Sequence, residues 1–111
     1  MRFLPGDFEV LTTLSGDTAT LTLRGELDMA TVNAVEQAIA AVGDEPRRLV
    51  IDLRELRFLD SMGLELFLAL DTRLRDAGRE LVLVRGPRAV HRLFEVMQLE
   101  SVLQIVDAPP G

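Results

Sequence analysis

The 111-residue sequence contains no cysteine, lysine, tryptophan or tyrosine. Without cysteine, the chain has no disulfide, no thiolate metal ligand and no cysteine nucleophile. Without lysine, it has no phosphate-binding loop of the G-x-x-x-x-G-K-[ST] type, so nucleotide hydrolysis of that kind is excluded. The absence of tryptophan and tyrosine removes the aromatic platforms on which single-stranded nucleic acids commonly stack.

The sequence also lacks a long apolar run and an excess of positive charge. No stretch approaches the ~20 apolar residues of a membrane span, and residues 1–7 contain no apolar run typical of a signal peptide. We therefore expect a cytoplasmic protein without membrane insertion. The formal net charge of −6, with scattered basic residues, argues against direct binding of nucleic acid.

Length and composition indicate one globular domain. The length fits a single domain, and hydrophobic residues make up 48% of the chain, which is enough to bury a substantial core. We expect residues 1–111 to form one domain, with its core between about residues 8 and 106 and a frayed tail over 107–111.

Two segments near the N-terminus alternate apolar and polar residues with the period of a β-strand. They run from Phe8 to Leu14 and from Thr18 to Arg24. The link between them is short and contains the turn residues serine, glycine and aspartate. This pattern predicts an antiparallel hairpin.

The following segments alternate between helical and extended patterns. Apolar residues at helical spacing predict an amphipathic helix over 32–42, with Asp28 as its N-cap. The near-continuous apolar run over 49–53 predicts a central strand that is buried on both faces. A second helix over about 61–77 and a strand over 81–84 extend the alternation, which predicts parallel strands joined by helical crossovers.

These elements predict an α/β fold with a mixed four-stranded sheet, whose first strand is antiparallel and whose next three strands are parallel. About four helices are expected to pack on the sheet. The third is marked by apolar residues at Val90, Leu93, Phe94 and Met97. Residues 102–106 fit a last helical turn, a short edge strand that makes the sheet five-stranded, or both. The expected core includes Leu21, Leu23, Val35, Ile39, Val50, Ile51, Leu64, Phe67, Leu83 and Phe94.

The stretch from Leu59 to Leu64 joins the buried strand region to the second helix. Asp60 and Ser61 are both residue types that cap helices, and the sequence leaves open which of them does so. Gly63 costs roughly 1 kcal/mol relative to alanine within a helix, so we expect a close approach there. A phosphate on Ser61 beside Asp60 would create a local charge of about −2.5 to −3.

We expect a protein-binding surface around this junction. On a helical wheel Met62, Glu65 and Ala69 lie opposite the apolar face, and Leu66 lies at its border. An apolar patch beside a modifiable hydroxyl suggests partner binding, although single exposed apolar residues are also normal.

A second segment is expected to contribute to the same surface. The loops that leave the carboxyl ends of parallel strands lie along one edge of a sheet. The turn formed by Gly25, Glu26, Leu27 and Asp28 should therefore lie beside Asp60, Ser61 and Gly63.

Hydrolase and metal-site interpretations find little support. In the nucleophile elbow of a serine hydrolase, a glycine lies two positions before the catalytic serine, and a histidine relay is also needed. In this chain Leu59, not glycine, lies two positions before Ser61. The only histidine, His91, lies on a predicted helix, where we expect a surface or partly packed side chain. Carboxylates such as Glu26 and Asp28 lie in turns without histidine, which argues against a metal site.

The order of four segments resembles that of the STAS family and, within it, the stand-alone bacterial anti-sigma factor antagonists. The segments are Gly25–Asp28, Leu49–Leu53, Phe58–Leu64 and Leu81–Val84. The resemblance extends from about Phe8 to Val106, and its most specific part is the D-S-x-G-L motif after a buried strand.

The resemblance implies a partner-switching protein without enzymatic activity, cofactor or metal. In that family the serine matching Ser61 is phosphorylated by an anti-sigma factor that is itself a serine kinase. The unphosphorylated form binds this kinase and frees a sigma factor, and a serine phosphatase resets the switch. The implied role is regulation of transcription, as in the stress response or sporulation.

Two positions depart from the family pattern. Met62 stands where many members have a second serine, which leaves Ser61 as the only acceptor in the motif. Glu65 stands where glycine is frequent and adds a charge that bears on partner choice. The alternatives are a STAS subunit of a lipid-transport complex and a structural component of a stress-signalling assembly. A purely structural subunit needs no acceptor hydroxyl beside Asp60, which favours the phosphorylated antagonist.

Overall fold

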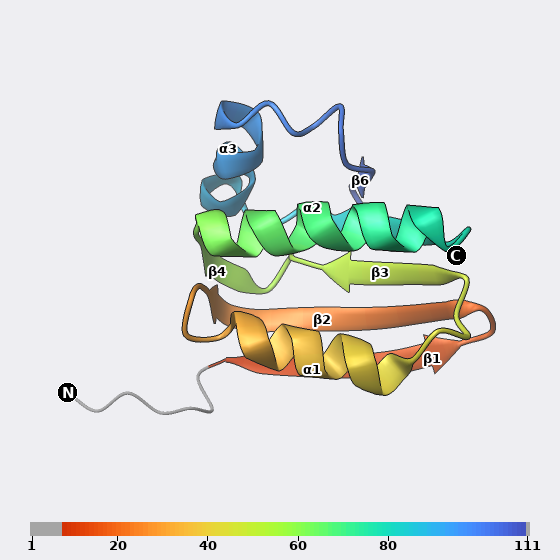
Figure 1. Cartoon of the computed structure of the whole chain (residues 1–111). Coiled ribbons are helices and arrows are strands. Elements are labelled where there is room, and N and C mark those ends of the chain that lie inside the picture. Colours follow the sequence, from red (N-terminus) through yellow and green to blue (C-terminus); the bar gives the residue numbers. More distant parts are fainter. Residues whose placement is uncertain (1–7, 111) are drawn as a thin grey trace.

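Helices and strands alternate along residues 8–110, the part of the chain that the computed structural model describes. Their order is β1 (Glu9–Ser15), β2 (Thr18–Leu27), α1 (Val32–Val42), β3 (Arg48–Asp52), β4 (Leu56–Leu59), α2 (Ser61–Asp76), β5 (Glu80–Val84), α3 (Arg88–Val96) and β6 (Ile105–Val106). Figure 1 shows their arrangement. No helix in this part is long and apolar enough to cross a membrane.

The strands form one mixed sheet in the order β1, β2, β3, β5 and β6, with β4 paired to β2 beyond the end of β3. β1 is antiparallel to β2, and the other pairs are parallel, so the predicted strand directions are confirmed. The sheet has six strands rather than four or five. The sequence did not predict β4 as a separate strand, and of the alternatives for residues 102–106 the structure contains the edge strand.

β2 is the longest strand and pairs with two partners in succession. Residues 18–22 pair with β3, and residues 25–27 pair with β4. The register shifts between Gly25 and Glu26, where Gly25 has φ 112°, a left-handed value that favours glycine. The shift lets β2 continue beside β4, whose last residue leads into α2.

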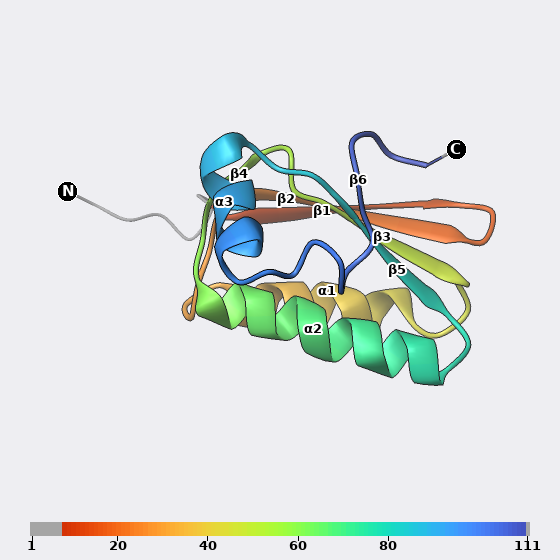
Figure 2. The same cartoon turned by 90° about the horizontal axis from the view of Figure 1, so that it is seen from above.

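The helices α1 and α2 cover one face of the sheet, and α3 lies beside β4 at one end (Figure 2). Nine of the ten predicted core residues are buried between these layers or within the sheet. The exception is Ile39, which packs against the core but also lines an open pocket between α1 and α2. The two-layer arrangement therefore follows the apolar pattern of the sequence.

The C-terminal part differs from the prediction of about four helices, because three are present within residues 8–110. After α3, Gln98 takes a left-handed φ of 57°, and residues 99–103 form isolated hydrogen-bonded turns. The sequence pattern predicts Met97 on the apolar face of the third helix, but α3 ends at Val96 and Met97 is exposed. The chain reverses too soon after α3 for a further helix to form.

The opposite face of the sheet contains a smaller apolar cluster of Val50, Val82 and Val84, against which Val106 packs. β3 and β5 are therefore buried on both faces, as the sequence predicts for β3. Beyond β6, Asp107 pairs with Arg85 at 2.8 Å. Fraying of the tail over 107–111 stays a prediction. Residue 111 and residues 1–7, where we expect no signal peptide, lie outside the described residues.

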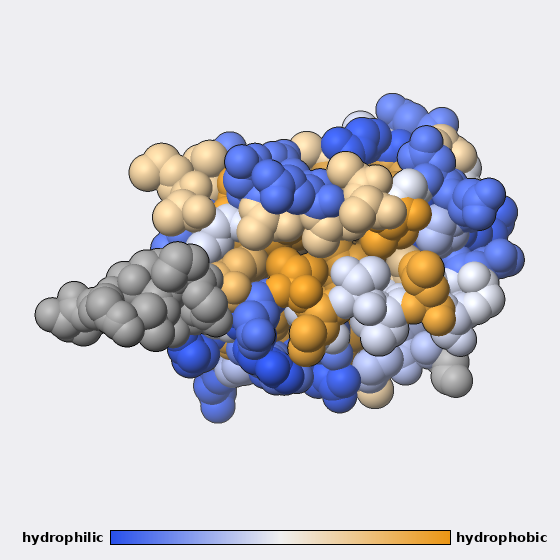
Figure 3. Space-filling view, turned by 90° about the horizontal axis from the view of Figure 1, so that it is seen from below, coloured by the Kyte–Doolittle hydropathy of each residue, from blue (hydrophilic) through white to orange (hydrophobic). Residues whose placement is uncertain are grey.

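β1 forms one edge of the sheet and shows an apolar surface. Seen from the side of β1 and α1, apolar side chains gather between polar margins (Figure 3). On β1 the exposed apolar residues are Leu11 and Leu14. This surface lies along the sheet edge, away from β4 and α3.

Asp52, at the end of β3, is a buried carboxylate whose hydrogen bonds come from Arg54. Burial alone would raise the pKa of Asp52, but hydrogen bonds from the Arg54 guanidinium and backbone N–H outweigh it and hold the pKa below its ordinary value. A carboxylate with a lowered pKa stabilises the fold above its unfolded pKa of about 3.9. This contribution is lost as the pH falls through the folded pKa.

The variant Asp52→Asn should therefore have a lower free energy of unfolding at neutral pH and a weaker loss of stability on acidification. Urea denaturation of both proteins at pH 7 and at several values below about pH 4 measures the difference. Parallel pH profiles for the two proteins would show that the carboxylate does not provide this stabilisation.

Candidate functional site

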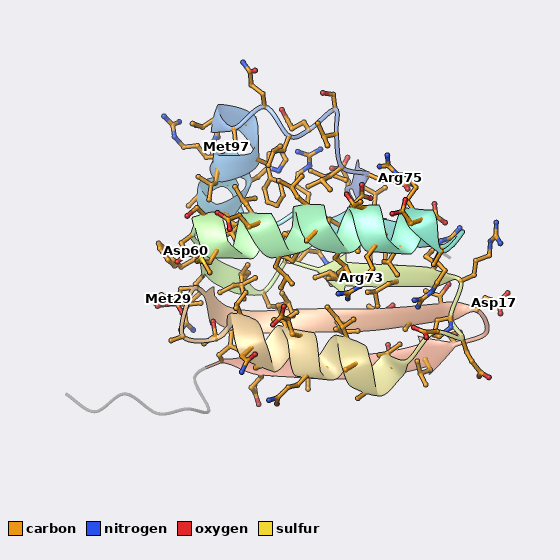
Figure 4. The ribbon with its side chains drawn as sticks, viewed as in Figure 1. Asp17, Met29, Asp60, Arg73, Arg75 and Met97 are labelled. Atoms are coloured by element: carbon orange, nitrogen blue, oxygen red, sulfur yellow. The ribbon has the colours of Figure 1, made fainter. Side chains whose placement is uncertain are left out.

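The first turn of α2 meets the carboxyl end of β2 at one end of the sheet. The Asp60 N–H donates to the Leu27 carbonyl at 3.2 Å, and Gly63 lies against the Leu27 side chain. Residues 25–28 and the start of α2 are therefore neighbours, as the sheet topology predicts. The predicted turn at this position is wrong, because residues 25–27 belong to β2 and pair with β4, and only Asp28 lies beyond the strand. Figure 4 shows Asp60 and Met29 at this same end of the molecule.

Asp60, and not Ser61, caps α2. One Asp60 carboxylate oxygen accepts hydrogen bonds from the N–H groups of Met62 at 2.9 Å and Gly63 at 3.3 Å. Ser61 is the first helical residue and is exposed, and its hydroxyl makes no hydrogen bond within residues 8–110. The choice that the sequence left open is thus decided by geometry. Ser61 is therefore exposed, and its hydroxyl is not needed for capping.

At Gly63 the helix lies close against side chains of the sheet. A Cβ atom at this position would lie 3.0 Å from Leu27 Cδ2 and closer still to Leu59 Cδ1, so a larger residue would force these side chains to move. The expected close approach at Gly63 is confirmed. This close packing places the first turn of α2 directly against β2 and β4.

The predicted partner-binding residues fall into two groups. One group supports the backbone from inside, and the other forms the surface that a partner would meet. The buried residues are Gly25, Leu27 and Gly63; the exposed or partly exposed residues are Glu26, Asp28, Asp60, Ser61, Met62, Glu65, Leu66 and Ala69. Met62 has 38% of its surface exposed, which agrees with its predicted position on the outer face.

Asp28 does not cap α1 as the sequence predicts. The helix begins at Val32 with Thr31 as N-cap. The Asp28 carboxylate instead accepts from the Ala30 N–H at 2.9 Å, and the Thr31 hydroxyl donates to the Glu26 carbonyl at 2.7 Å. These bonds hold the loop before α1 in place. Aspartate and threonine side chains readily form such hydrogen bonds with nearby backbone groups.

Two exposed apolar residues near the site were missed by sequence reasoning. Met29, in the loop before α1, is 74% exposed, and Phe58, on β4, is 47% exposed. Phe58 lies in a strand of four residues, which is too short to show a clear alternation of apolar and polar side chains. Met29 was recognisable as a large apolar residue next to a turn and outside any helical pattern.

His91 is buried rather than on the surface. Its ring stacks on Phe94 with the centroids 5.8 Å apart, and its Nε2 lies 2.7 Å from a Glu100 carboxylate oxygen. The potential ligand atoms of His91, Glu95 and Glu100 are within 4.8 Å of one another. However, the Arg85 guanidinium also contacts His91 Nε2, and its positive charge opposes binding of a metal cation there.

The chain matches one protein family and several curated proteins. Residues 10–106 match the family described as "Mlab, STAS domain". The chain is 34% identical over 88 residues to the anti-sigma-F factor antagonist RsfB of Mycobacterium tuberculosis, which covers 78% of this chain and 71% of that protein. It is 29% identical over 82 residues to the anti-sigma-B factor antagonist of Staphylococcus aureus, which covers 73% of this chain and 76% of that protein.

Solved structures agree with these matches. An anti-sigma factor antagonist from Mycobacterium paratuberculosis superimposes with a TM-score of 0.79 and 28% identity, covering 95% of this chain and 90% of that chain. The unphosphorylated form of the anti-sigma factor antagonist SpoIIAA gives a TM-score of 0.72 at 21% identity, covering 89% and 87%. The second comparison supports the fold alone.

The packing at the start of α2 leads to a stability prediction. Gly63→Ala should lower the free energy of unfolding by about 1–3 kcal/mol, because overpacking outweighs the better helix propensity of alanine. Chemical denaturation measures this change.

Ser61→Ala is the matched control in the same turn. Its hydroxyl makes no capping bond, so the change should stay within about 0.5 kcal/mol. Equal stability of Gly63→Ala and the parent protein would show that the helix does not press on β2 at this point.

Proposed function

The chain belongs to the STAS domain family, and from this premise we propose that it is an anti-sigma factor antagonist controlled by phosphorylation of Ser61. The unphosphorylated protein binds an anti-sigma factor with serine kinase activity and thereby frees a sigma factor. Phosphorylation of Ser61 by that kinase blocks binding, and a serine phosphatase reverses it. The chain itself acts by binding and needs neither catalytic residues nor a cofactor.

The observation that carries the proposal is the position of Ser61. Its side chain is exposed at the start of α2, beside the partly exposed Asp60 and next to the exposed Met62. Because Asp60 provides the cap, modification of the serine leaves the capping bonds of α2 in place. A phosphate can therefore change the surface without unfolding the helix.

The charges around Ser61 explain how a phosphate would oppose binding. The Asp60 carboxylate already accepts from two amides of the first turn, so a phosphate adds its charge next to an anion that is already in place. Glu65 follows one helical turn later and adds further negative charge on that side. A partner that docks over Met62 and Leu66 would have to desolvate this anionic cluster, which costs several kcal/mol without a cation.

The size of this effect suffices for a switch. At about 1.4 kcal/mol per tenfold in affinity, a penalty of about 3 kcal/mol weakens binding more than a hundredfold. Such a change releases a partner that is bound with moderate affinity.

The variant Met62→Glu tests whether the outer face of α2 binds the partner. Its affinity for the cognate anti-sigma factor should fall by about tenfold or more, because a charge enters the centre of the apolar contact. Its melting temperature should stay close to that of the parent, since Met62 is partly exposed. Calorimetric titration and thermal unfolding measure the two quantities.

Val102→Glu is a matched control, because Val102 is an exposed apolar residue in the turns that follow α3. Its affinity should equal that of the parent. Equal affinity of all three proteins would remove the outer face of α2 from the interface.

Phosphorylation itself gives the test of the proposed function. Incubation with the cognate kinase and ATP should modify Ser61, as mapped by mass spectrometry, and the modified protein should bind the anti-sigma factor at least about a hundredfold more weakly. Ser61→Ala should bind constitutively, and Ser61→Asp should fold normally and bind poorly. Modification at another residue, equal affinity of both forms, or binding to a transporter complex instead would refute the proposal.

A further inference from the structure

A shallow groove opens between β4 and α3, next to the start of α2. We call it the β4–α3 groove, and its lining includes Arg57, Phe58, Ala89, Arg92, Leu93 and Val96. The chain runs from Phe58 through Leu59 directly into Asp60 and Ser61, so the groove adjoins the surface described above. Figures 1 and 4 show β4, α3 and Asp60 at one end of the molecule.

Several large apolar side chains lie together in the β4–α3 groove. Phe58 is 47% exposed and Val96 is 63% exposed, and both line the groove together with the partly buried Leu93. Scattered exposed apolar residues are normal, but large ones that share a concave site are typical of binding surfaces. This supports docking of an apolar side chain.

The charge of the groove is opposite to that of the chain. Its lining contains two arginines and no carboxylate, although the protein has 18 acidic and 12 basic residues. Neither Arg57 nor Arg92 forms an ion pair with any residue of the described range 8–110. Two unpaired guanidinium groups beside apolar side chains are complementary to carboxylates that flank an apolar residue.

Two other surface pockets of the described residues 8–110 differ from the groove in charge. The pocket between α1 and α2 contains Asp44, which pairs with Arg79. Another pocket, near the end of α2, contains the paired Asp71 and Arg75. The first of these pockets is also lined by Glu36 and Arg73, so it contains charges of both signs, whereas the charged residues that line the β4–α3 groove are both arginines.

We propose that the β4–α3 groove binds an acidic segment of the partner protein that carries a large apolar side chain. This inference rests on the proposed function, because the partner is the anti-sigma factor that docks at Ser61. The apolar side chain lies between Phe58 and Val96, and flanking carboxylates pair with Arg57 and Arg92. One partner can occupy both surfaces because they adjoin.

The contact at the β4–α3 groove changes the expected effect of phosphorylation at Ser61 on partner binding. A phosphate on Ser61 repels the partner from α2, but the groove presents two arginines on the other side of β4. The phosphorylated protein therefore keeps a weak, salt-sensitive contact with its partner. Such a contact makes release incomplete at low ionic strength.

A peptide titration tests the groove without the partner. The probe is a synthetic 12-residue peptide of glutamate and leucine with leucines at helical spacing, and the control replaces each glutamate by lysine. With 15N-labelled protein, the acidic peptide should shift the amide signals of β4 and α3, saturate, and bind several-fold more weakly at high salt. No shifts in these elements, or equal shifts with the lysine peptide, would overturn the proposal.

Variants test the groove against the cognate anti-sigma factor. Arg92→Glu should lower the affinity about tenfold and leave the melting temperature unchanged, because Arg92 is exposed and unpaired. Arg73→Glu makes the same charge change at an exposed arginine far along α2 and should have less than a twofold effect. Equal affinities of the two variants would contradict the groove.

The two proposals fail in different ways. If Met62→Glu weakens binding and Arg92→Glu does not, the groove is wrong and the proposed function stands. If the anti-sigma factor does not bind the parent protein, the proposed function is wrong. The glutamate peptide then still shows whether the groove accepts an acidic segment.

Discussion

The close contact between the first turn of α2 and the carboxyl end of β2 determines the arrangement of the functional end of this protein. Gly63 allows the helix to lie against Leu27 and Leu59, and the Asp60 N–H holds the same strand through the Leu27 carbonyl. With the helix fixed in this orientation, Ser61 and the residues that follow it on the outer face must point to solvent. The backbone around Ser61 is thus held in place by contacts of β2 and β4 with α2.

Two neighbouring surfaces at that end of the molecule carry opposite charge. Beside Ser61 along the chain, Asp60 and Glu65 are acidic, and no cation within residues 8–110 pairs with either of them. Across β4, the β4–α3 groove presents Arg57 and Arg92 without carboxylates. A partner that covers both surfaces needs an apolar contact at α2 and an acidic segment at the groove. This combination gives specificity that neither surface has alone.

Much of the fold and of the site was predictable because the decisive patterns extend over many residues. The hairpin, β3 and α2 each show a clear period or apolar run, and the sheet topology brings residues 25–28, at the end of β2, to α2. β4 and β6 have only four and two residues, too few for a period, so Phe58 was missed. Asp60 and Ser61 are both capping residues, and only the three-dimensional structure shows which one accepts the amide hydrogen bonds.

The central claim is that phosphorylation at Ser61 changes local charge on a surface that stays rigid. Amide NMR spectra of the phosphorylated and unphosphorylated proteins, recorded without a partner, test it most directly. We predict that chemical-shift changes are confined to the first turns of α2 and to the adjoining residues 25–28 at the end of β2. Changes that extend through β3, β5 and α3 would show that the phosphate rearranges the fold, and would contradict the account.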